Sequence, residues 1–258
     1  MSDRDWKINR IATCASPILT CLLILIWQEA SVNGLLSAII LPPPTKIFAA
    51  FKRMLEDGSL VRHVGMSFKR VMIGYALGAG SGIIMGFLLG IFKPLERLTS
   101  FLFGLIRPIP PLAMLPVLIL WLGIGENSKI AVIALVAFWP TFLNSQEGIA
   151  QTDTKLLELS TVLKKNRWQK VYSIVLPSTI PYVFAGLRLS ISRAWGGVVV
   201  AEMLAASAGV GFLIQYSREL SKPDMMLAGV ITIAVIGYLI DIILSFIQKR
   251  ICFWHMVK

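Results

Sequence analysis

Residues 71–92 read VMIGYALGAGSGIIMGFLLGIF, an apolar run without a charged side chain. A helix needs about 20 such residues to cross the hydrocarbon layer of a membrane. Within the run, glycine recurs at every fourth position, at Gly74, Gly78, Gly82, Gly86 and Gly90. This spacing places the five glycines on one narrow stripe of a helix, where a neighbouring helix can approach backbone to backbone. The stripe therefore predicts a membrane helix with a packing face.

Five further segments are apolar enough to cross a membrane with their flanks. The six predicted spans are Ile11–Trp27, Val71–Phe92, Leu98–Leu122, Lys129–Glu147, Ser178–Ala206 and Met226–Ile247. The chain of 258 residues is 56% hydrophobic and 15% charged, which is typical of a protein whose solvent is lipid. We expect an all-α integral membrane protein with six transmembrane helices, forming a single domain over residues 1–258. The first run lacks a small-residue cleavage pattern, so it is interpreted as a span rather than a removed signal.

The formal charge of +11 is distributed around the apolar runs. A nucleic-acid-binding protein would instead cluster basic residues beside exposed aromatic side chains. Lys and Arg near the spans are more numerous on one side, and the positive-inside rule then places both chain ends in the cytoplasm. The cysteines Cys14, Cys21 and Cys252 lack the spacing of a disulfide framework.

An amphipathic helix is predicted between the first two spans, after Pro42-Pro43-Pro44 and before Gly58. Its apolar residues recur at helical spacing, at Ile47, Phe48, Phe51, Met54 and Leu55. Such a helix can lie on the outer membrane surface or along neighbouring spans. A solvated surface helix has the same pattern and stays an alternative.

The third span contains a proline-rich segment that a regular helix cannot run through, because proline removes a backbone donor and clashes with the preceding turn. Broken backbone at membrane depth is tolerated where protein or a water-filled cavity satisfies the freed carbonyls. We therefore predict part of a translocation path at Arg107, Pro108, Pro110, Pro111 and Met114. In the alternative interpretation, Arg107 and Pro108 lie at the headgroups and the helix begins later.

The fifth span carries Arg188, Arg193 and Glu202. Arg188 and Glu202 share a helix face but lie roughly 21 Å apart along the axis, so they cannot pair directly. At least one of the two arginines should find a partner on another helix or line an aqueous path. We favour structural pairing for Arg188, whereas pairing and solute contact both stay open for Arg193. Glu202 and Trp195 are also placed on the predicted path.

In the sixth span, Asp241 precedes Lys249 and Arg250 by a turn or two. A snorkelling or helix-end role is the favoured interpretation of this carboxylate.

Residues 150–177 join the fourth and fifth spans and are too polar to insert in a membrane. Leu156, Leu159 and Leu163 precede a Lys164-Lys165-Asn166 break, and apolar residues resume at Trp168. The pattern predicts two short amphipathic helices with a turn between them, which need a surface to pack against.

This loop resembles the signature loop of binding-protein-dependent ABC importer permeases. The family pattern is Glu-Ala-Ala, three residues, Gly, about nine residues and Ile-x-Leu-Pro. Glu158-Leu159-Ser160 corresponds to its first part and Ile174-Val175-Leu176-Pro177 to its last. Lys164 stands where the family has glycine, and a left-handed turn there would cost roughly 1–2 kcal/mol. Further stretches resemble the sulfonate, taurine and nitrate branch: Leu41–Pro44, Arg107–Ala113, Trp121–Gly125, Gly186–Arg188, Ala194–Trp195 and Ala201–Met203.

The resemblance implies a permease in the cell membrane of a prokaryote. The permease would pair with a second copy, sit on two ATP-binding cassette ATPase subunits and receive solute from an extracytoplasmic binding protein. Its cytoplasmic coupling helix would contact the ATPase through Glu158, Leu159, Ser160, Leu163, Lys164, Arg167 and Trp168. The sequence has no Gly-x-x-x-x-Gly-Lys-Ser/Thr phosphate loop, so ATP and Mg would be bound by the ATPase, and no cofactor or metal is expected in this chain.

The expected solute is a small anion, because Arg107 and Arg193 suit charge-assisted hydrogen bonds. Among small anions, an aliphatic sulfonate or taurine is the favoured solute. Nitrate or another oxyanion and a vitamin-precursor ring compound are the alternatives. A membrane enzyme would need a catalytic set facing one site, and the only histidines, His63 and His255, lie outside the predicted spans. A secondary transporter or channel would not require the docking loop.

Overall fold

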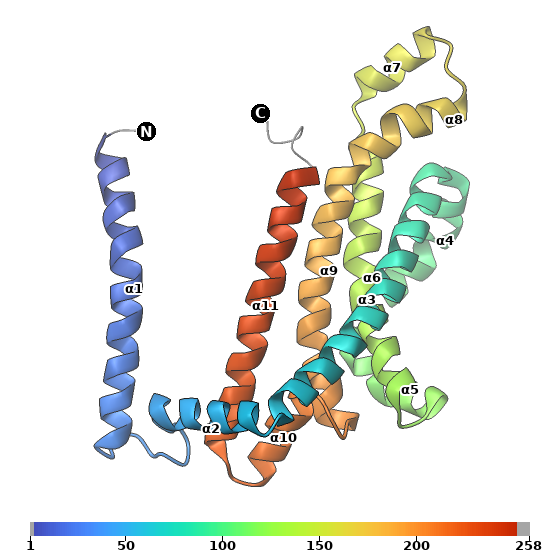
Figure 1. The fold of residues 1–258 in the computed structure, drawn as a ribbon. Helices are drawn as coiled ribbons and strands as arrows, with labels where there is room; N and C mark the ends of the chain where they lie inside the picture. Colours follow the sequence, from blue (N-terminus) through green and yellow to red (C-terminus); the bar gives the residue numbers. More distant parts are fainter. Residues whose placement is uncertain (1–2, 252–258) are drawn as a thin grey trace. The chain divides into compact units, whose positions relative to one another are not determined.

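Every regular element among residues 3–251 is a helix, which confirms the predicted all-α class (Figure 1). The computed structural model describes the backbone over this range and side chains from residue 18 to residue 251. The α-helices are α1 (Asp3–Val32), α2 (Pro44–Glu56), α3 (Ser59–Ile91), α4 (Lys93–Ile106), α5 (Leu115–Leu122), α6 (Glu126–Ala150), α7 (Thr154–Val162), α8 (Arg167–Lys170), α9 (Leu176–Ala205), α10 (Val210–Glu219) and α11 (Pro223–Ile251). A 3-10 turn (Pro111–Met114) precedes α5, and a π-helical turn (Val171–Val175) precedes α9.

Four helical stretches are long and apolar enough to cross a membrane, namely α3, α6, Arg167–Ala205 and α11. The pair Lys93–Ile106 and Pro111–Leu122 is bent by 78° and counts as a fifth span if taken as one. These five match predicted spans two to six. Predicted span one lies within α1, where the side chains of residues 11–17 are outside the described part, and Ile18–Val32 alone is a shorter apolar helix.

The described chain forms two compact units, one of residues up to Val61 with Leu213–Ile231, and the other of Arg62–Phe212 with the chain from Thr232 onward. In the first unit, the Gln28 side chain exchanges two hydrogen bonds of 3.2 Å with Thr45, which join the end of α1 to the start of α2. An Arg53–Asp224 ion pair of 3.2 Å joins α2 to α11.

The predicted amphipathic helix is α2. Its buried side chains are Ile47, Ala50 and Met54, whereas Phe48 is exposed. Pro44 begins the helix at the position where a missing backbone donor costs least, and Gly58 follows its end with a φ of 73°.

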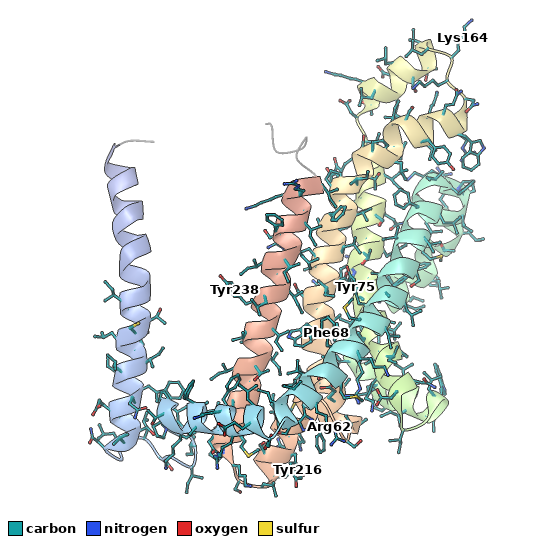
Figure 2. All side chains as sticks on the ribbon, viewed as in Figure 1. Arg62, Phe68, Tyr75, Lys164, Tyr216 and Tyr238 are labelled. Atoms are coloured by element: carbon teal, nitrogen blue, oxygen red, sulfur yellow. The ribbon has the colours of Figure 1, made fainter. Side chains whose placement is uncertain are left out.

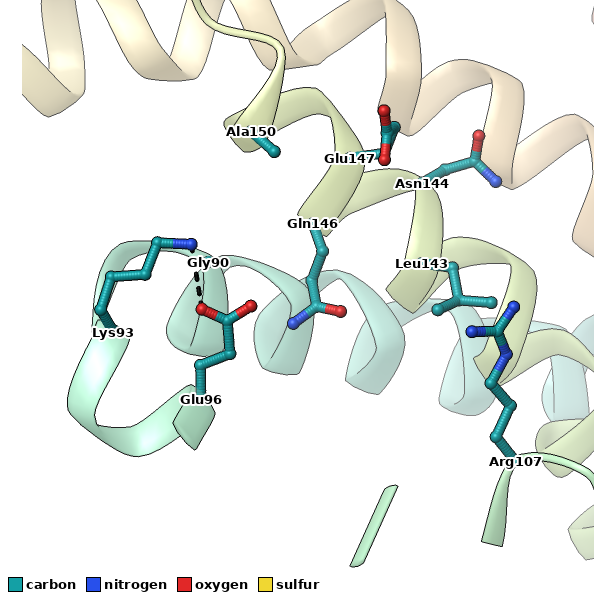
Figure 3. A pocket seen from close by; sticks show the side chains of 9 residues that line it. All are labelled: Gly90, Lys93, Glu96, Arg107, Leu143, Asn144, Gln146, Glu147 and Ala150. Atoms are coloured by element: carbon teal, nitrogen blue, oxygen red, sulfur yellow. Dashed lines mark hydrogen bonds and ion pairs between the residues drawn. The ribbon is translucent and has the colours of Figure 1, made fainter. Parts of the chain in front are cut away.

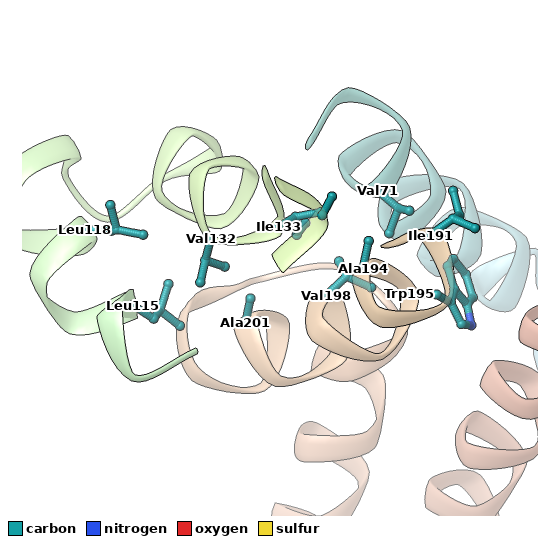
Figure 4. Packing of buried hydrophobic residues seen from close by; sticks show 11 residues of the cluster. Val71, Leu115, Leu118, Val132, Ile133, Ile191, Ala194, Trp195, Val198 and Ala201 are labelled. Carbon is teal, nitrogen blue, oxygen red and sulfur yellow. The ribbon is translucent and has the colours of Figure 1, made fainter. Parts of the chain in front are cut away.

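The core of the second unit lies where α6 and α9 run side by side (Figures 1 and 4). Val132, Ile133 and Ala137 of α6 pack against Ala194 and Val198 of α9. Val71, Leu115, Leu118, Ile191, Trp195 and Ala201 complete this buried cluster. The helices approach closely because glycines replace side chains at their contact: a Cβ on Gly186 would lie 2.8 Å from the Asn144 Cβ.

The glycine stripe of α3 lies against α6. A Cβ at Gly74 would meet Ile133, one at Gly82 would lie 2.7 Å from the Phe138 carbonyl oxygen, and one at Gly86 would lie 2.5 Å from the Ser145 Cβ. Gly78 and Gly90 face Ala134 and Ile149 of the same helix. The contact is therefore backbone to backbone at Gly78 and Gly82, and at Gly74, Gly86 and Gly90 the α3 backbone lies against side chains of α6.

The predicted start of the second span was wrong. Helix α3 begins at Ser59 rather than Val71, so Arg62, Lys69 and Arg70 lie within a helix and not in an outer loop, and so does His63. His255 lies outside the described residues. Burial of Arg70, which is only 2% exposed, explains the error, because a paired charge lowers the local hydropathy without ending the helix.

Candidate translocation site

A cavity of about 550 Å³ lies between the proline break, α6 and α9. It is lined by Arg107, Pro110, Pro111, Leu112, Val136, Trp139, Leu143, Arg193, Gly196 and Gly197. The break itself follows from the sequence, because α4 ends at Ile106 and the chain passes Pro108 and Pro110 before the next helical turn begins. Four predicted path residues, Arg107, Pro110, Pro111 and Arg193, are thus brought to one cavity.

The two arginines of this cavity are free. Neither the Arg107 nor the Arg193 guanidinium has a hydrogen bond or ion pair with any described residue, and both residues are exposed. No acidic residue lines the cavity within the described chain. Since an unpaired charge in a membrane helix needs water or an anion, the cavity suits a negatively charged solute.

A second cavity of about 460 Å³ adjoins the first, and Arg107 and Leu143 line both (Figure 3). Its other lining residues are Gly90, Lys93, Glu96, Asn144, Gln146, Glu147 and Ala150. Val136, Trp139, Leu143, Glu147 and Ala150 recur at helical spacing on α6, so one face of this helix passes from the first cavity to the second.

The other four predicted path residues do not line this cavity. Trp195 is 4% exposed in the core, and its indole N–H donates to the Ile233 carbonyl oxygen at 3.0 Å. Met114 packs against the same core, and Pro108 does not line the cavity. Glu202 is buried in a network of charged side chains.

That network, which we call the Arg70 cluster, comprises Ser67, Arg70, Glu126, Lys129 and Glu202. Arg70 donates from Nε and Nη2 to the two carboxylate oxygens of Glu126, at 2.7 and 2.8 Å. Its Nη1 donates to Glu202 Oε1 at 2.7 Å and also to the Ala208 carbonyl oxygen. Lys129 pairs with Glu126 at 3.0 Å and donates to the Ala205 carbonyl oxygen at 3.2 Å. Each charge therefore has an opposite partner.

The Arg70 cluster also caps α10. The Glu202 carboxylate accepts from the Gly211 N–H at 2.9 Å, and the Ser67 hydroxyl accepts from the Val210 N–H at 2.8 Å. A carboxylate at a helix N-terminus satisfies donors that have no partner within the helix. Arg70, Glu126 and Lys129 were not predicted as a group from the sequence. The available signal was the three-residue spacing from Glu126 to Lys129 at the start of a span.

The prediction for Asp241 was wrong. Its carboxylate pairs with Arg188 through two bonds of 2.8 Å, from Nε and Nη2. The structural pairing favoured for Arg188 is therefore present. The partner lies on α11, and the periodicity of the fifth span alone could not predict which helix carries it.

The loop between α6 and α9 contains two short helices, as predicted. Asp153 caps the start of α7 by accepting from the Lys155 N–H at 2.8 Å, and Asn166 forms a capping box with Gln169 at α8. Lys164 lies at the turn between them with a φ of 53° (Figure 2). Leu156, Leu159, Val162, Leu163, Trp168 and Tyr172 are all exposed, so the loop presents an apolar surface without a partner among the described residues.

Two predicted coupling residues face the rest of the chain. Ser160 is 1% exposed, and its hydroxyl donates to the Leu157 carbonyl oxygen at 2.6 Å. Arg167 donates to the Ile91 carbonyl oxygen at 3.3 Å and lies 5.2 Å from the centre of the Phe92 ring. Arg167 thus ties the loop to the corner between α3 and α4.

Residues 78–252 match the model of the family described as binding-protein-dependent transport system inner membrane component. The chain belongs to this family. The permease is 38% identical to the "Putative aliphatic sulfonates transport permease protein SsuC" of Bacillus subtilis, with 92% of this chain and 86% of that protein covered. It is 31% identical to the taurine transport system permease protein TauC of Escherichia coli, with 97% of this chain and 92% of that protein covered. It is also 31% identical to the nitrate import permease protein NrtB of Synechococcus elongatus, with 95% of this chain and 93% of that protein covered.

Solved structures show the same fold. The permease matches a chain of the MetNI methionine ABC transporter, in an inward-facing form, with a TM-score of 0.65 and 20% identity over 74% of this chain and 95% of that one. It also matches a chain of an amino acid ABC transporter with a TM-score of 0.66 and 15% identity, over 78% of this chain and 98% of that one. The chain is therefore an ABC transporter permease subunit that spans the inner membrane several times.

Proposed function

We propose that this permease carries a small organic anion, an aliphatic sulfonate or taurine, through the cavity that contains Arg107 and Arg193. The observation that carries the proposal is the pair of unpaired guanidiniums in a cavity without an acidic lining residue. Each guanidinium can hold a sulfonate oxygen by a charge-assisted hydrogen bond.

The apolar wall favours a sulfonate over nitrate. Leu112, Val136, Trp139 and Leu143 line the same cavity as the two arginines. An alkyl tail can bury its surface against these side chains, whereas nitrate has no apolar part. The names of the similar permeases point the same way, since two of them refer to sulfonates or taurine and one to nitrate.

The exposed apolar residues of α7 and α8 support a docking role for the loop. In our proposal, a separate ATPase binds ATP and Mg and seats this coupling loop in a groove, at the cytoplasmic side. Two copies of the permease and two ATPases would switch the path between inward-open and outward-open states, and an extracytoplasmic binding protein would deliver the solute. Both chain ends would then lie in the cytoplasm.

The test is uptake of labelled taurine, ethanesulfonate and nitrate in cells with and without this chain, with the cognate ATPase and binding protein retained. Sulfonate uptake should require the chain. Arg193→Gln should lower it about tenfold or more, because a hydrogen bond to a charged group is lost. Arg62→Gln removes the same charge from an exposed residue that does not line the cavity, and should have little effect. Normal entry of all three solutes without the chain would refute the assignment.

A further inference from the structure

The second cavity, between α4 and α6, carries opposite charges that the first cavity lacks (Figure 3). We propose that it is a subsite for an aminosulfonate, in which Arg107 binds the sulfonate and Glu147 binds the ammonium group. This inference rests on the proposed function and concerns the solute's second charge.

Charge balance singles out Glu147. Four charged residues line the cavity, and Lys93 and Glu96 neutralise each other through an ion pair of 2.9 Å. The only hydrogen bond to the Glu147 carboxylate within the described chain comes from the neutral Gln151 amide, at 2.7 Å. Arg107 has no partner among the described side chains. One negative and one positive group are therefore left for a ligand.

The Arg107 guanidinium and the Glu147 carboxylate lie at different levels of α6. The Arg107 guanidinium lies beside Leu143 (Figure 3), and Glu147 follows Leu143 by one helical turn on the same face. One turn advances the chain by about 6 Å for four residues. A short zwitterion, with an anionic group at one end and an ammonium at the other, fits such a spacing, and the cavity volume is within the range of small-molecule sites.

Arg107 serves both cavities in this arrangement. It borders a cavity whose apolar residues suit an uncharged alkyl tail and a second cavity that Glu147 also lines. An alkanesulfonate and an aminosulfonate would share the headgroup anchor but place their tails in different cavities. Glu147 would then act only on a solute that carries an ammonium group.

The experiment compares taurine with ethanesulfonate, which differ by the ammonium group alone, in the complete transporter. Glu147→Gln should lower taurine uptake about tenfold, because the charge-assisted hydrogen bond is lost. Ethanesulfonate uptake should stay within about twofold of the wild type, since its tail does not reach Glu147. Glu147→Asp keeps the charge and should retain most of the taurine uptake.

Glu219→Gln is the matched control, because Glu219 also accepts from a glutamine four residues away, Gln215, at 2.8 Å. It should leave both solutes unaffected. Equal loss of both solutes in Glu147→Gln would overturn the subsite, as would taurine uptake at the wild-type rate. If the unmodified transporter takes up ethanesulfonate but does not take up taurine, the subsite is refuted and the proposed function stands. If neither solute depends on the chain, both the proposed function and this subsite are wrong.

Discussion

At the scale of single residues, Lys164 and Ser221 share an unusual backbone conformation, with φ values of 53° and 54°. Each residue follows the end of a helix, and each forms, together with the residue after it, the same two backbone hydrogen bonds. The Lys164 N–H donates to the Thr161 carbonyl and the next N–H donates to Ser160, and Ser221 and its neighbour repeat this pattern with Arg218 and Ser217. This hydrogen-bond pattern is the Schellman motif, whose left-handed position is usually occupied by glycine.

Lys164→Gly and Ser221→Gly should therefore each stabilise the folded chain by about 1 kcal/mol, because glycine adopts the left-handed conformation without a steric penalty. Thermal unfolding in detergent measures the change. Lys165→Gly is the control, since Lys165 has no positive φ and should gain nothing. A lower unfolding temperature for Lys164→Gly would show that the lysine makes a contact that outweighs its strain.

Two ion pairs provide a second comparison at this scale, because Arg70–Glu202 is buried whereas the arginine of Arg53–Asp224 is exposed. Arg70→Met should lower the free energy of unfolding by about 3–5 kcal/mol, because Glu202 would be left buried and without its cation. Arg53→Met breaks an ion pair whose arginine is 68% exposed and should cost below about 1 kcal/mol. Denaturant unfolding of both variants is the measurement, and equal losses would contradict the assigned burial.

At the scale of elements, the contact between α3 and α6 depends on the absence of side chains. A Cβ on Gly78 would overlap the Ala134 backbone, whereas one on Gly80 of the same helix would meet no atom within 4 Å. Gly78→Ala should therefore destabilise the fold by about 1–3 kcal/mol. Gly80→Ala should stabilise it by about 1 kcal/mol, since alanine favours the helix. If thermal unfolding gives both variants the same stability, the stripe is not a packing face.

The elements also show what sequence patterns can and cannot predict. Hydropathy placed α6, α9 and α11 within a few residues, because these helices are apolar along most of their length. It missed the first turns of α3, where Arg70 is buried by partners 56 and 132 residues away in the chain. The pair of Arg188 with Asp241 was missed for the same reason, because helical periodicity within one segment carries no information about a second helix.

For the candidate site, the sequence placed the proline break, Arg193 and Trp195 on one predicted path, whereas the structure places Trp195 in the core. An aromatic residue near two arginines has the same local pattern whether it lines a cavity or packs in the core, and only the tertiary contact to Ile233 distinguishes the two. Glu147 was regarded only as the end of a span, since its place in a cavity depends on where α4 runs.

At the scale of the whole molecule, the α7–α8 loop lies at the opposite end of α6 and α9 from the Arg70 cluster (Figure 1). Leu159 is 55% exposed there, so its replacement should cost little folding energy. Leu159→Arg should abolish ATP-driven uptake while thermal unfolding stays unchanged. Leu159→Met keeps the apolar contact and should transport normally. Undiminished uptake in Leu159→Arg would refute a docking role for this surface.

The Arg70 cluster has an electrical consequence. Its two cations and two carboxylates sum to zero, so any motion of this part of the permease moves no net charge through the membrane field, in which one elementary charge costs about 2.3 kcal/mol per 100 mV. Arg107 and Arg193 carry charge that the described chain does not neutralise. If the cavity lies in this field and binds the solute as proposed, its positive charge responds to the membrane voltage when it is empty, and a bound anion cancels part of that response. In our proposal, the membrane voltage would therefore act more strongly on the empty cavity than on the loaded one.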